Sequence, residues 1–263
     1  MAIIHPSAVV EEGAVLADDA VIGPHCYVGS EVVIGSKTTL FHGASIHGKT
    51  TIGAENRIFS HAVIGSIPQD LKFHGEESRL EIGDRNTIRE FTLLNSGTEG
   101  GGHLTKLGND NLLMGYVHVA HDCIIGDRCI LANGATLAGH VELGHGVVIG
   151  GLTPVHQFVK IGDLAMIAGA SALSQDVPPY CLAEGNRAVL RGLNLTGLRR
   201  HLESREEVDH LKTAYRMLFE SGQPLKENAQ ILFDTTTSKH VKALCRFVIA
   251  TTRGIPYERK GEE

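Results

Sequence analysis

Four histidines that could carry out acid–base chemistry lie close together in the sequence, at His118, His121, His140 and His156. Imidazole titrates near neutrality, so a histidine can remove or donate a proton at physiological pH. Asp122 directly follows His121, and a turn that directed its carboxylate back would orient the ring and favour the imidazolium. This pair is typical of a general base. The alternatives are a solvated surface side chain for each histidine and a simple turn residue for Asp122.

Gly139 lies 18 residues after His121 and occupies the same position of a six-residue segment. If the chain coils with about 18 residues per turn, Gly139 lies one coil from His121 on the same side. Glycine lets a ligand approach the backbone closely, and its amide N–H could stabilise an oxyanion in acyl transfer. Cys123, in contrast, is expected to be a small inward-facing packing residue.

The elements that must position these groups follow from a repeat of six residues. Aliphatic side chains stand at every sixth position from Ile4 to Ile64 and from Leu107 to Leu173, with a shorter run over 82–94. A helix would need apolar spacings of three and four, and a β-sandwich lacks this strict period. A period of six matches the parallel β-helix, in which three flat sides close a triangular coil. We therefore expect a mainly β fold, with a parallel β-helix over residues 1–187.

The repeat is interrupted twice, over 66–79 and 95–106. We expect both segments to be extruded loops, which on a regular scaffold tend to carry function. Asp70 and Lys72 lie in the first, with solvated loop charges as the alternative reading.

Helical spacing replaces the repeat after Pro178 and Pro179. A helix is expected over 204–220, where Ser204 and Glu207 fit a capping box, and two more over 225–233 and 239–251. These helices predict a small α-helical C-terminal domain, residues 188–263, that packs against the open end or side of the β-helix.

Composition limits the class of protein. The net charge of −6 argues against a nucleic-acid surface. Five cysteines without a CxxC pair argue against a disulfide framework or structural zinc and favour a reducing compartment. The N-terminus lacks a signal peptide pattern, and no window is long and apolar enough for a membrane span. We therefore expect a cytoplasmic protein with no integral membrane segment and no nucleic-acid partner.

An ordered set of motifs, together with the repeat, resembles the UDP-N-acetylglucosamine O-acyltransferase family. The motifs are QDLK at 69–72, HVAHDC at 118–123, ATLAGHVELG at 135–144, VHQF at 155–158, QDVPPY at 175–180 and EGNRA at 184–188. Hexapeptide repeats alone are common to many transferases, whereas this set in this order is specific. The resemblance extends over essentially the whole chain.

This resemblance implies a left-handed β-helix and a homotrimer with active sites between neighbouring subunits. The implied reaction, which needs no metal or cofactor, moves an (R)-3-hydroxyacyl chain from acyl carrier protein to the 3-hydroxyl of UDP-N-acetylglucosamine, the first step of lipid A biosynthesis. It implies His121 as the general base, Asp122 as its support and the Gly139 amide as the oxyanion donor. Family positions that bind the substrates correspond to Gln69, Asp70, Lys72, His118, His140, His156, Gln157, Asn194 and Arg200. Gly169 falls where the family has its acyl-chain ruler, which favours a long chain.

Two residues depart from the family pattern: Thr196 replaces a common glutamate near the uracil, and Asn95 replaces a histidine. Both concern the acceptor, which could also be the 3-amino analogue of the sugar and would then give an N-acyl product.

Three other functions compete with this interpretation. One is a related hexapeptide N-acyltransferase of the same pathway, against which the QDLK loop and the C-terminal helices argue. Another is a metalloenzyme of the carbonic anhydrase type with a three-histidine zinc site, which stoichiometric zinc in the purified protein would favour. The last is a non-catalytic trimeric scaffold.

The expected donor is acidic, so a basic patch should receive the acyl carrier protein despite the negative net charge. The candidate residues are Arg187, Arg191, Arg199, Arg200 and Arg216.

Overall fold

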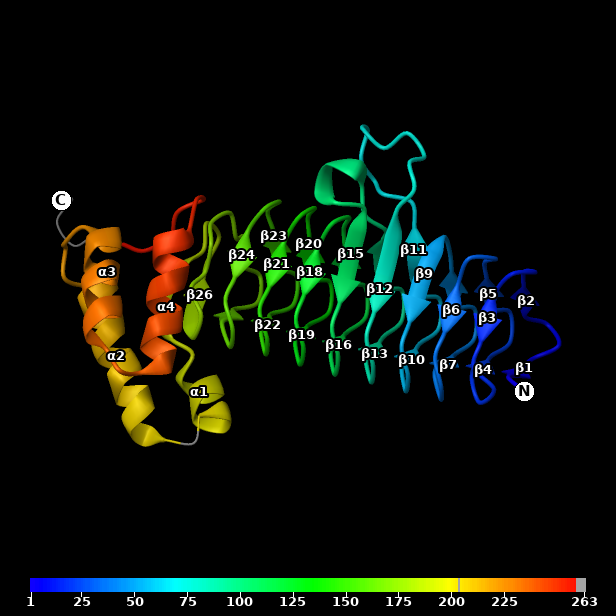
Figure 1. Cartoon of the computed structure of the whole chain (residues 1–263), viewed down its shortest axis with the longest axis horizontal. Coiled ribbons are helices and arrows are strands. Elements are labelled where there is room, and N and C mark those ends of the chain that lie inside the picture. The colour runs from blue at the N-terminus through cyan, green and yellow to red at the C-terminus, as the bar shows by residue number, and fades with distance from the viewer. Residues whose placement is uncertain (203, 259–263) are drawn as a thin grey trace.

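Three parallel sheets form the faces of a long β-helix, and four helices lie at its C-terminal end (Figure 1). The computed structural model describes residues 1–202 and 204–258. Sheet A contains β1 Ile3–Ile4, β4 Val21–Ile22, β7 Thr39–Leu40, β10 Arg57–Ile58, β13 Thr87–Ile88, β16 Leu112–Leu113, β19 Ile130–Leu131, β22 Val148–Ile149, β25 Met166–Ile167, β26 Cys181–Glu184 and β27 Val189–Leu193. Sheet B contains β2 Val9–Val10, β5 Tyr27–Val28, β8 Ser45–Ile46, β11 Val63–Ser66, β14 Leu93–Asn95, β17 His118–Val119, β20 Thr136–Leu137 and β23 Pro154–Val155. Sheet C contains β3 Val15–Leu16, β6 Val33–Ile34, β9 Lys49–Ile52, β12 Arg79–Ile82, β15 Leu104–Leu107, β18 Ile124–Ile125, β21 Glu142–Leu143 and β24 Lys160–Ile161.

The core consists of the aliphatic residues of the six-residue repeat, stacked in columns. Most strands contain two residues whose side chains point to opposite faces, so Ile58 is buried while Arg57 is exposed. Paired strands align equivalent residues, as Val119 and Leu137 show. The repeat therefore fixes which residue faces inward in each coil, and the predicted parallel β-helix is confirmed.

Two loops leave the same corner of the triangular coil, between sheets B and C, in successive coils. Residues 67–78 connect β11 to β12, and residues 96–103 connect β14 to β15 and contain the short 3₁₀ helix η1, Glu99–Gly101. Figure 1 shows both loops rising together from the β-helix. Further along the β-helix, the corner between sheets B and C is made by residues 120–123, then 138–141, then 156–159. We call this series the B–C corner row.

The C-terminal helices are α1 Leu195–His201, α2 Arg205–Phe219, α3 Leu225–Thr235 and α4 Lys239–Ala250. The three predicted helices correspond to α2, α3 and α4, whereas α1 and the antiparallel pair β26–β27 were not expected. The predicted boundary after residue 187 falls in the turn between β26 and β27, which both belong to sheet A. Within the part of the chain described, no helix combines the length and apolar character needed to cross a bilayer.

The predicted capping box at the start of α2 is wrong in one partner. Ser204 caps the helix by accepting a hydrogen bond from the Glu206 amide, at 3.2 Å. The Glu207 carboxylate instead accepts the hydroxyl of Ser238, the residue that caps α4. Glu207 therefore connects the N-termini of α2 and α4, because it bonds the distant Ser238 hydroxyl instead of the local backbone.

Candidate active site

The chain turns sharply at His121 and Asp122, in the corner between β17 and β18. Asp122 has a φ of 60°, in the left-handed region that aspartate tolerates better than most residues. This turn brings its carboxylate back to the preceding ring, and His121 Nδ1 lies 2.8 Å from Asp122 Oδ2. The structure therefore contains the turn that a pair formed by His121 and Asp122 needs.

The Asp122 carboxylate is buried among donors, with 1 % of its side chain exposed. Thr98 donates its amide to Oδ1 at 2.8 Å and its hydroxyl to Oδ2 at 2.6 Å. An ionised carboxylate only accepts hydrogen bonds, so the proton between it and His121 belongs to Nδ1. Nε2 of a neutral His121 then carries the lone pair, which is the form a general base needs.

The imidazole of His121 lies against Gly139, one coil further along the B–C corner row. A Cβ at position 139 would lie 2.5 Å from Cε1 and 2.7 Å from Nε2 of that ring, so any other residue there would have to displace the ring. The amides on either side of Gly139 pair with Val155 O and His121 O. The Gly139 N–H itself has no hydrogen-bond partner among the described residues. The candidate base and the candidate oxyanion donor thus lie side by side.

His140 completes this cluster. Its ring meets that of His121 edge to face at 5.1 Å and stacks on Phe158 at 4.3 Å. Burial lowers the pKa of His140, and the carboxylates of Asp122 and Asp70 oppose this effect only in part. His140 is therefore neutral at physiological pH and can serve as a hydrogen-bond partner.

His118 lies on the outer side of sheet B, just before the corner. Burial lowers its pKa, and its Nδ1 is buried without a partner among the described residues. Such an atom usually has a partner in the functional state of a protein, which fits the predicted role in substrate binding. Cys123 points inward as expected, and burial raises the pKa of its thiol to about 12, so it is no nucleophile.

Several other predicted residues lie at corners between sheets B and C before and after His121. Gln69 and Lys72 are exposed on the 67–78 loop, whose turn is closed by the Lys72 amide donating to Asp70 Oδ1 at 3.0 Å. His156 and Gln157 are exposed at the next corner after Gly139. His156 Nδ1 lies 3.2 Å from Nη2 of Arg253, a cation that the sequence did not single out.

Three predicted residues do not join His121 within one chain. Gly169 lies at the corner between sheets A and B, the opposite edge of sheet B, three coils further along. Asn194 caps α1 by accepting the Gly197 amide at 3.0 Å and donates to Leu164 O at 2.9 Å. Arg200 is exposed in the last turn of α1, which lies on the far side of the molecule from the extruded loops (Figure 1).

His121, Asp122 and His140 could also be considered as metal ligands, since one ligand atom from each lies within 4.8 Å of the others. However, both oxygens of Asp122 already accept hydrogen bonds from Thr98, and Oδ2 also accepts one from His121. A cation bound by Nδ1 of His121 would have to displace the proton on that atom. The donor set therefore fits a histidine–carboxylate pair better than a metal centre.

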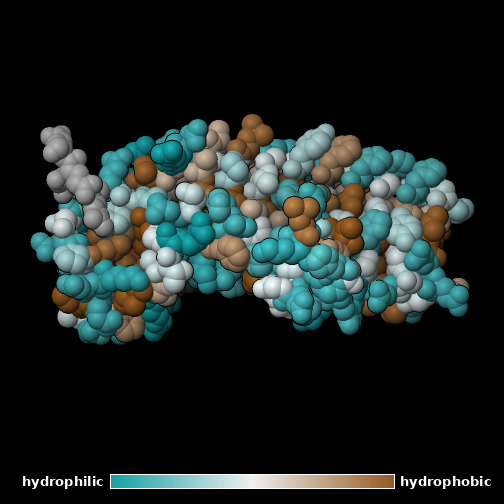
Figure 2. All heavy atoms as spheres, turned by 90° about the horizontal axis from the view of Figure 1, so that it is seen from above, coloured by the Kyte–Doolittle hydropathy of each residue, from teal (hydrophilic) through white to brown (hydrophobic). Residues whose placement is uncertain are grey.

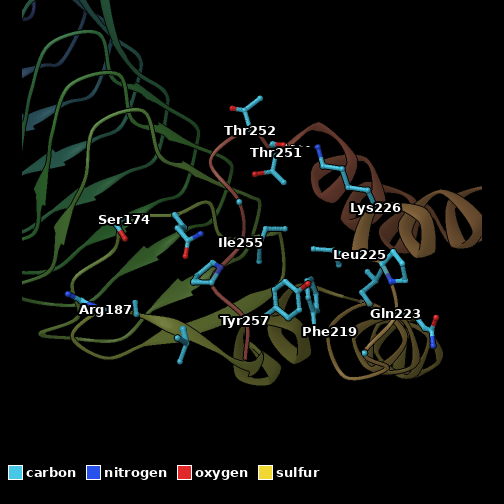
Figure 3. A pocket seen from close by; sticks show the side chains of 18 residues that line it. Ser174, Arg187, Phe219, Gln223, Leu225, Lys226, Thr251, Thr252, Ile255 and Tyr257 are labelled. Carbon is cyan, nitrogen blue, oxygen red and sulfur yellow. Dashed lines mark hydrogen bonds between the residues drawn. The ribbon is translucent and has the colours of Figure 1, made fainter. Parts of the chain in front are cut away.

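A large cavity of about 1310 Å³ lies elsewhere, where the β-helix meets the helices (Figure 3). Ser174 and Arg187 line it from the β-helix side, and Phe219, Leu225 and Lys226 from the helical side. None of the predicted catalytic or substrate-binding residues lines this cavity.

Coiled hexapeptide repeats with a histidine–carboxylate pair beside a free backbone amide define a hexapeptide-repeat acyltransferase. The family described as bacterial transferase hexapeptide (six repeats) matches residues 104–139, and domain 2 of UDP-N-acetylglucosamine O-acyltransferase matches residues 176–256. The chain belongs to the UDP-N-acetylglucosamine O-acyltransferase family.

The relatives cover nearly the whole chain. A protein of Sulfurovum sp. named acyl-[acyl-carrier-protein]--UDP-N-acetylglucosamine O-acyltransferase is 64 % identical over 99 % of this chain and 100 % of its own length. One of the same name from Aliarcobacter butzleri is 66 % identical over 80 % of each chain. The solved UDP-N-acetylglucosamine acyltransferase from Campylobacter jejuni is 53 % identical, with a TM-score of 0.94 over 97 % of this chain and 100 % of its own. The predicted left-handed β-helix and acyltransferase class are confirmed.

Proposed function

We propose that this chain transfers an (R)-3-hydroxyacyl group from acyl carrier protein to the 3-hydroxyl of UDP-N-acetylglucosamine, the first step of lipid A biosynthesis. The names of its relatives support both substrates. The observation that carries the catalytic part of the proposal is the contact of the His121 ring with Gly139.

In the proposed reaction, His121 Nε2 removes the proton from the sugar 3-hydroxyl while the oxygen attacks the thioester carbonyl carbon. A C–O bond forms, and the negative charge that develops on the carbonyl oxygen is stabilised by the Gly139 N–H. Asp122 stabilises the imidazolium through Nδ1. The tetrahedral intermediate then collapses with cleavage of the C–S bond, and the imidazolium returns its proton to the departing thiolate.

The arrangement of one chain favours a homotrimer with shared sites. Gly169 lies across sheet B from His121, and Asn194 and Arg200 lie on the side away from the loops. The face that carries the loops is mostly hydrophilic, with small separate hydrophobic areas (Figure 2), so the described residues of one chain show no continuous apolar groove there for a long acyl chain. We infer that the neighbouring subunit supplies the chain ruler and the nucleotide contacts.

The acidic carrier protein is proposed to dock on the exposed arginines of the C-terminal region. Arg199 and Arg216 lie in the last turns of α1 and α2, where a cation is also favoured by the helix dipole. Arg191 is already paired with Glu258, at 3.3 Å. We therefore expect charge reversal at Arg199 and Arg216 together to raise KM for acyl-ACP.

A substrate panel tests the proposal. The purified protein is incubated with (R)-3-hydroxyacyl-ACPs of several lengths and with UDP-N-acetylglucosamine or its 3-amino analogue, and the products are read by mass spectrometry. We expect an alkali-labile O-acyl product from the first sugar. Amide formation from the amine alone would instead identify the acceptor as the 3-amino sugar. It would also connect the departures at Asn95 and Thr196 with the choice of acceptor. Transfer to neither sugar would contradict the proposed function.

A further inference from the structure

The 96–103 loop forms a lid over Asp122, the partner of His121. Thr98 places both its amide and its hydroxyl on the carboxylate, one on each oxygen. Thr105, at the start of the following strand, accepts the Asp122 amide at 2.7 Å. Thr98 therefore holds the carboxylate from the side of the loop, and His121 holds it from the other side. Thr98 and Thr105 both lie more than fifteen positions from Asp122 in the sequence.

Gly101 is the part of the lid that lies closest to the carboxylate. A Cβ at position 101 would lie 1.9 Å from Asp122 Cγ and 2.2 Å from Oδ1, so any side chain there must displace the carboxylate. At Gly100, the nearest atom to such a Cβ is Thr98 Oγ1 at 3.9 Å. Of these two neighbouring glycines in one 3₁₀ turn, Gly100 has room for a side chain, whereas Gly101 does not because the Asp122 carboxylate occupies the space.

The first extruded loop braces this lid. Ser78 Oγ and Ser96 Oγ are 2.8 Å apart, and His103 Nδ1 lies 2.7 Å from the Glu77 carbonyl oxygen. Within the lid, the His103 amide donates to Thr98 O at 2.7 Å. The loop is therefore an ordered support whose inner face meets Asp122.

We propose that Thr98 and Gly101 are positioning residues for acyl transfer, holding the Asp122 carboxylate so that His121 keeps its proton on Nδ1 and its lone pair on Nε2. Neither residue touches the sugar or the thioester, and both act through Asp122. This inference rests on the proposed function, because it assigns these residues to the same base.

Thr98→Val keeps the amide donor and side-chain size but removes the hydroxyl, and Thr98→Ser restores the hydroxyl. We expect Thr98→Val to lower kcat about tenfold or more, in the range expected for losing a hydrogen bond to a charged group, with KM for both substrates within about twofold of the parent. Thr98→Ser should recover most of kcat. Gly101→Ala should lower kcat about a hundredfold, whereas Gly100→Ala should match the parent.

The pH profile separates positioning from general loop stability. The charged and titratable groups around His121 are Asp122, His140 and His118. Displacing Asp122 removes the anion beside the imidazolium, so the acidic limb of kcat/KM in Gly101→Ala should move to lower pH. Gly100→Ala should leave this limb in place, and circular dichroism should show both variants folded.

The kinetics of these variants decide whether Thr98 and Gly101 position Asp122. A Gly101→Ala variant with the kcat and pH profile of Gly100→Ala would overturn the inference, as would a Thr98→Ser variant as slow as Thr98→Val. Losses that appear only as a raised KM would also overturn it, because they would assign the loop to substrate binding. Failure of the parent chain itself to acylate UDP-N-acetylglucosamine would contradict the proposed function, which is a separate result.

Discussion

The ring of His121 lies so close to Gly139 that a methyl group added to that glycine would lie 2.5 Å from Cε1 of the ring. The two residues are 18 positions apart and meet because one coil of the β-helix has that length. The N–H of Gly139 remains unpaired among the described residues, next to the ring that we propose as the general base.

Gly139→Ala is predicted to damage catalysis without unfolding the protein. The new Cβ must push the His121 ring out of its place, so we expect kcat to fall about a hundredfold, since misplacement by about 1 Å can have this effect. Gly29→Ala is a matched control at an earlier corner between sheets B and C, because its Cβ would lie 3.5 Å from the nearest atom, an ordinary contact. Steady-state kinetics of both variants would show the difference, and equal activity would argue against a tight base–glycine contact.

Gly169→Met is predicted to shorten the preferred acyl chain. Gly169 is exposed, and a Cβ there would lie 3.4 Å from Gly151 O, so the backbone accepts a side chain that projects outward. Competition between acyl-ACPs of different lengths should then shift toward shorter chains, with activity retained on the short ones. An unchanged length preference would remove Gly169 from the role of ruler.

Hybrids of the proposed homotrimer test whether His121 and Gly169 of one site come from different subunits. His121→Ala trimers should be inactive, and Gly169→Met trimers should reject long chains. Every mixed trimer contains an interface where an intact His121 faces an intact Gly169, so purified hybrids should recover long-chain transfer. Hybrids that remain inactive on long chains would place both residues in a site of one chain.

Stability is predicted to fall as pH drops below about 6.5. Burial lowers the pKa of His118 and His140 from 6.5, so protonation in this range favours the unfolded chain. Their contribution is fully present above the unfolded pKa and decreases below it. The free energy of unfolding is measured in urea at about pH 7.5 and 5.5, at fixed protein concentration. Its decrease between these pH values should be smaller for His118→Gln than for the control His5→Gln at an exposed site. An equal decrease in unfolding free energy in both variants would contradict the predicted contribution of His118.

The regular part of the molecule was predictable because one rule decides it. The period of six identifies the inward residue of each coil, as Ile58 and Leu137 illustrate, and coil arithmetic then places Gly139 beside His121. The same rule located both extruded loops, since each interrupts the period.

The contacts of the irregular segments could not be predicted. Thr98 and Gly101 reach Asp122 through a 3₁₀ turn whose path depends on tertiary contacts, and the sequence signals only an unusual run of glycines there. The side chain of Asn194, expected to bind nucleotide, is engaged as a helix cap, and α1 itself is short enough to escape the periodicity test. The nucleotide role of Asn194 stays a prediction.

The most direct test of the account compares His121→Gln with His145→Gln in acyl transfer from (R)-3-hydroxyacyl-ACP to the UDP-sugar acceptor. His145 also pairs with an aspartate, Asp127 at 3.3 Å, but on a different edge of the coil. We predict that kcat/KM falls roughly 10³-fold or more for His121→Gln and stays near the parent value for His145→Gln, with both proteins folded. Near-parent turnover by His121→Gln would contradict the central claim that this imidazole is the general base.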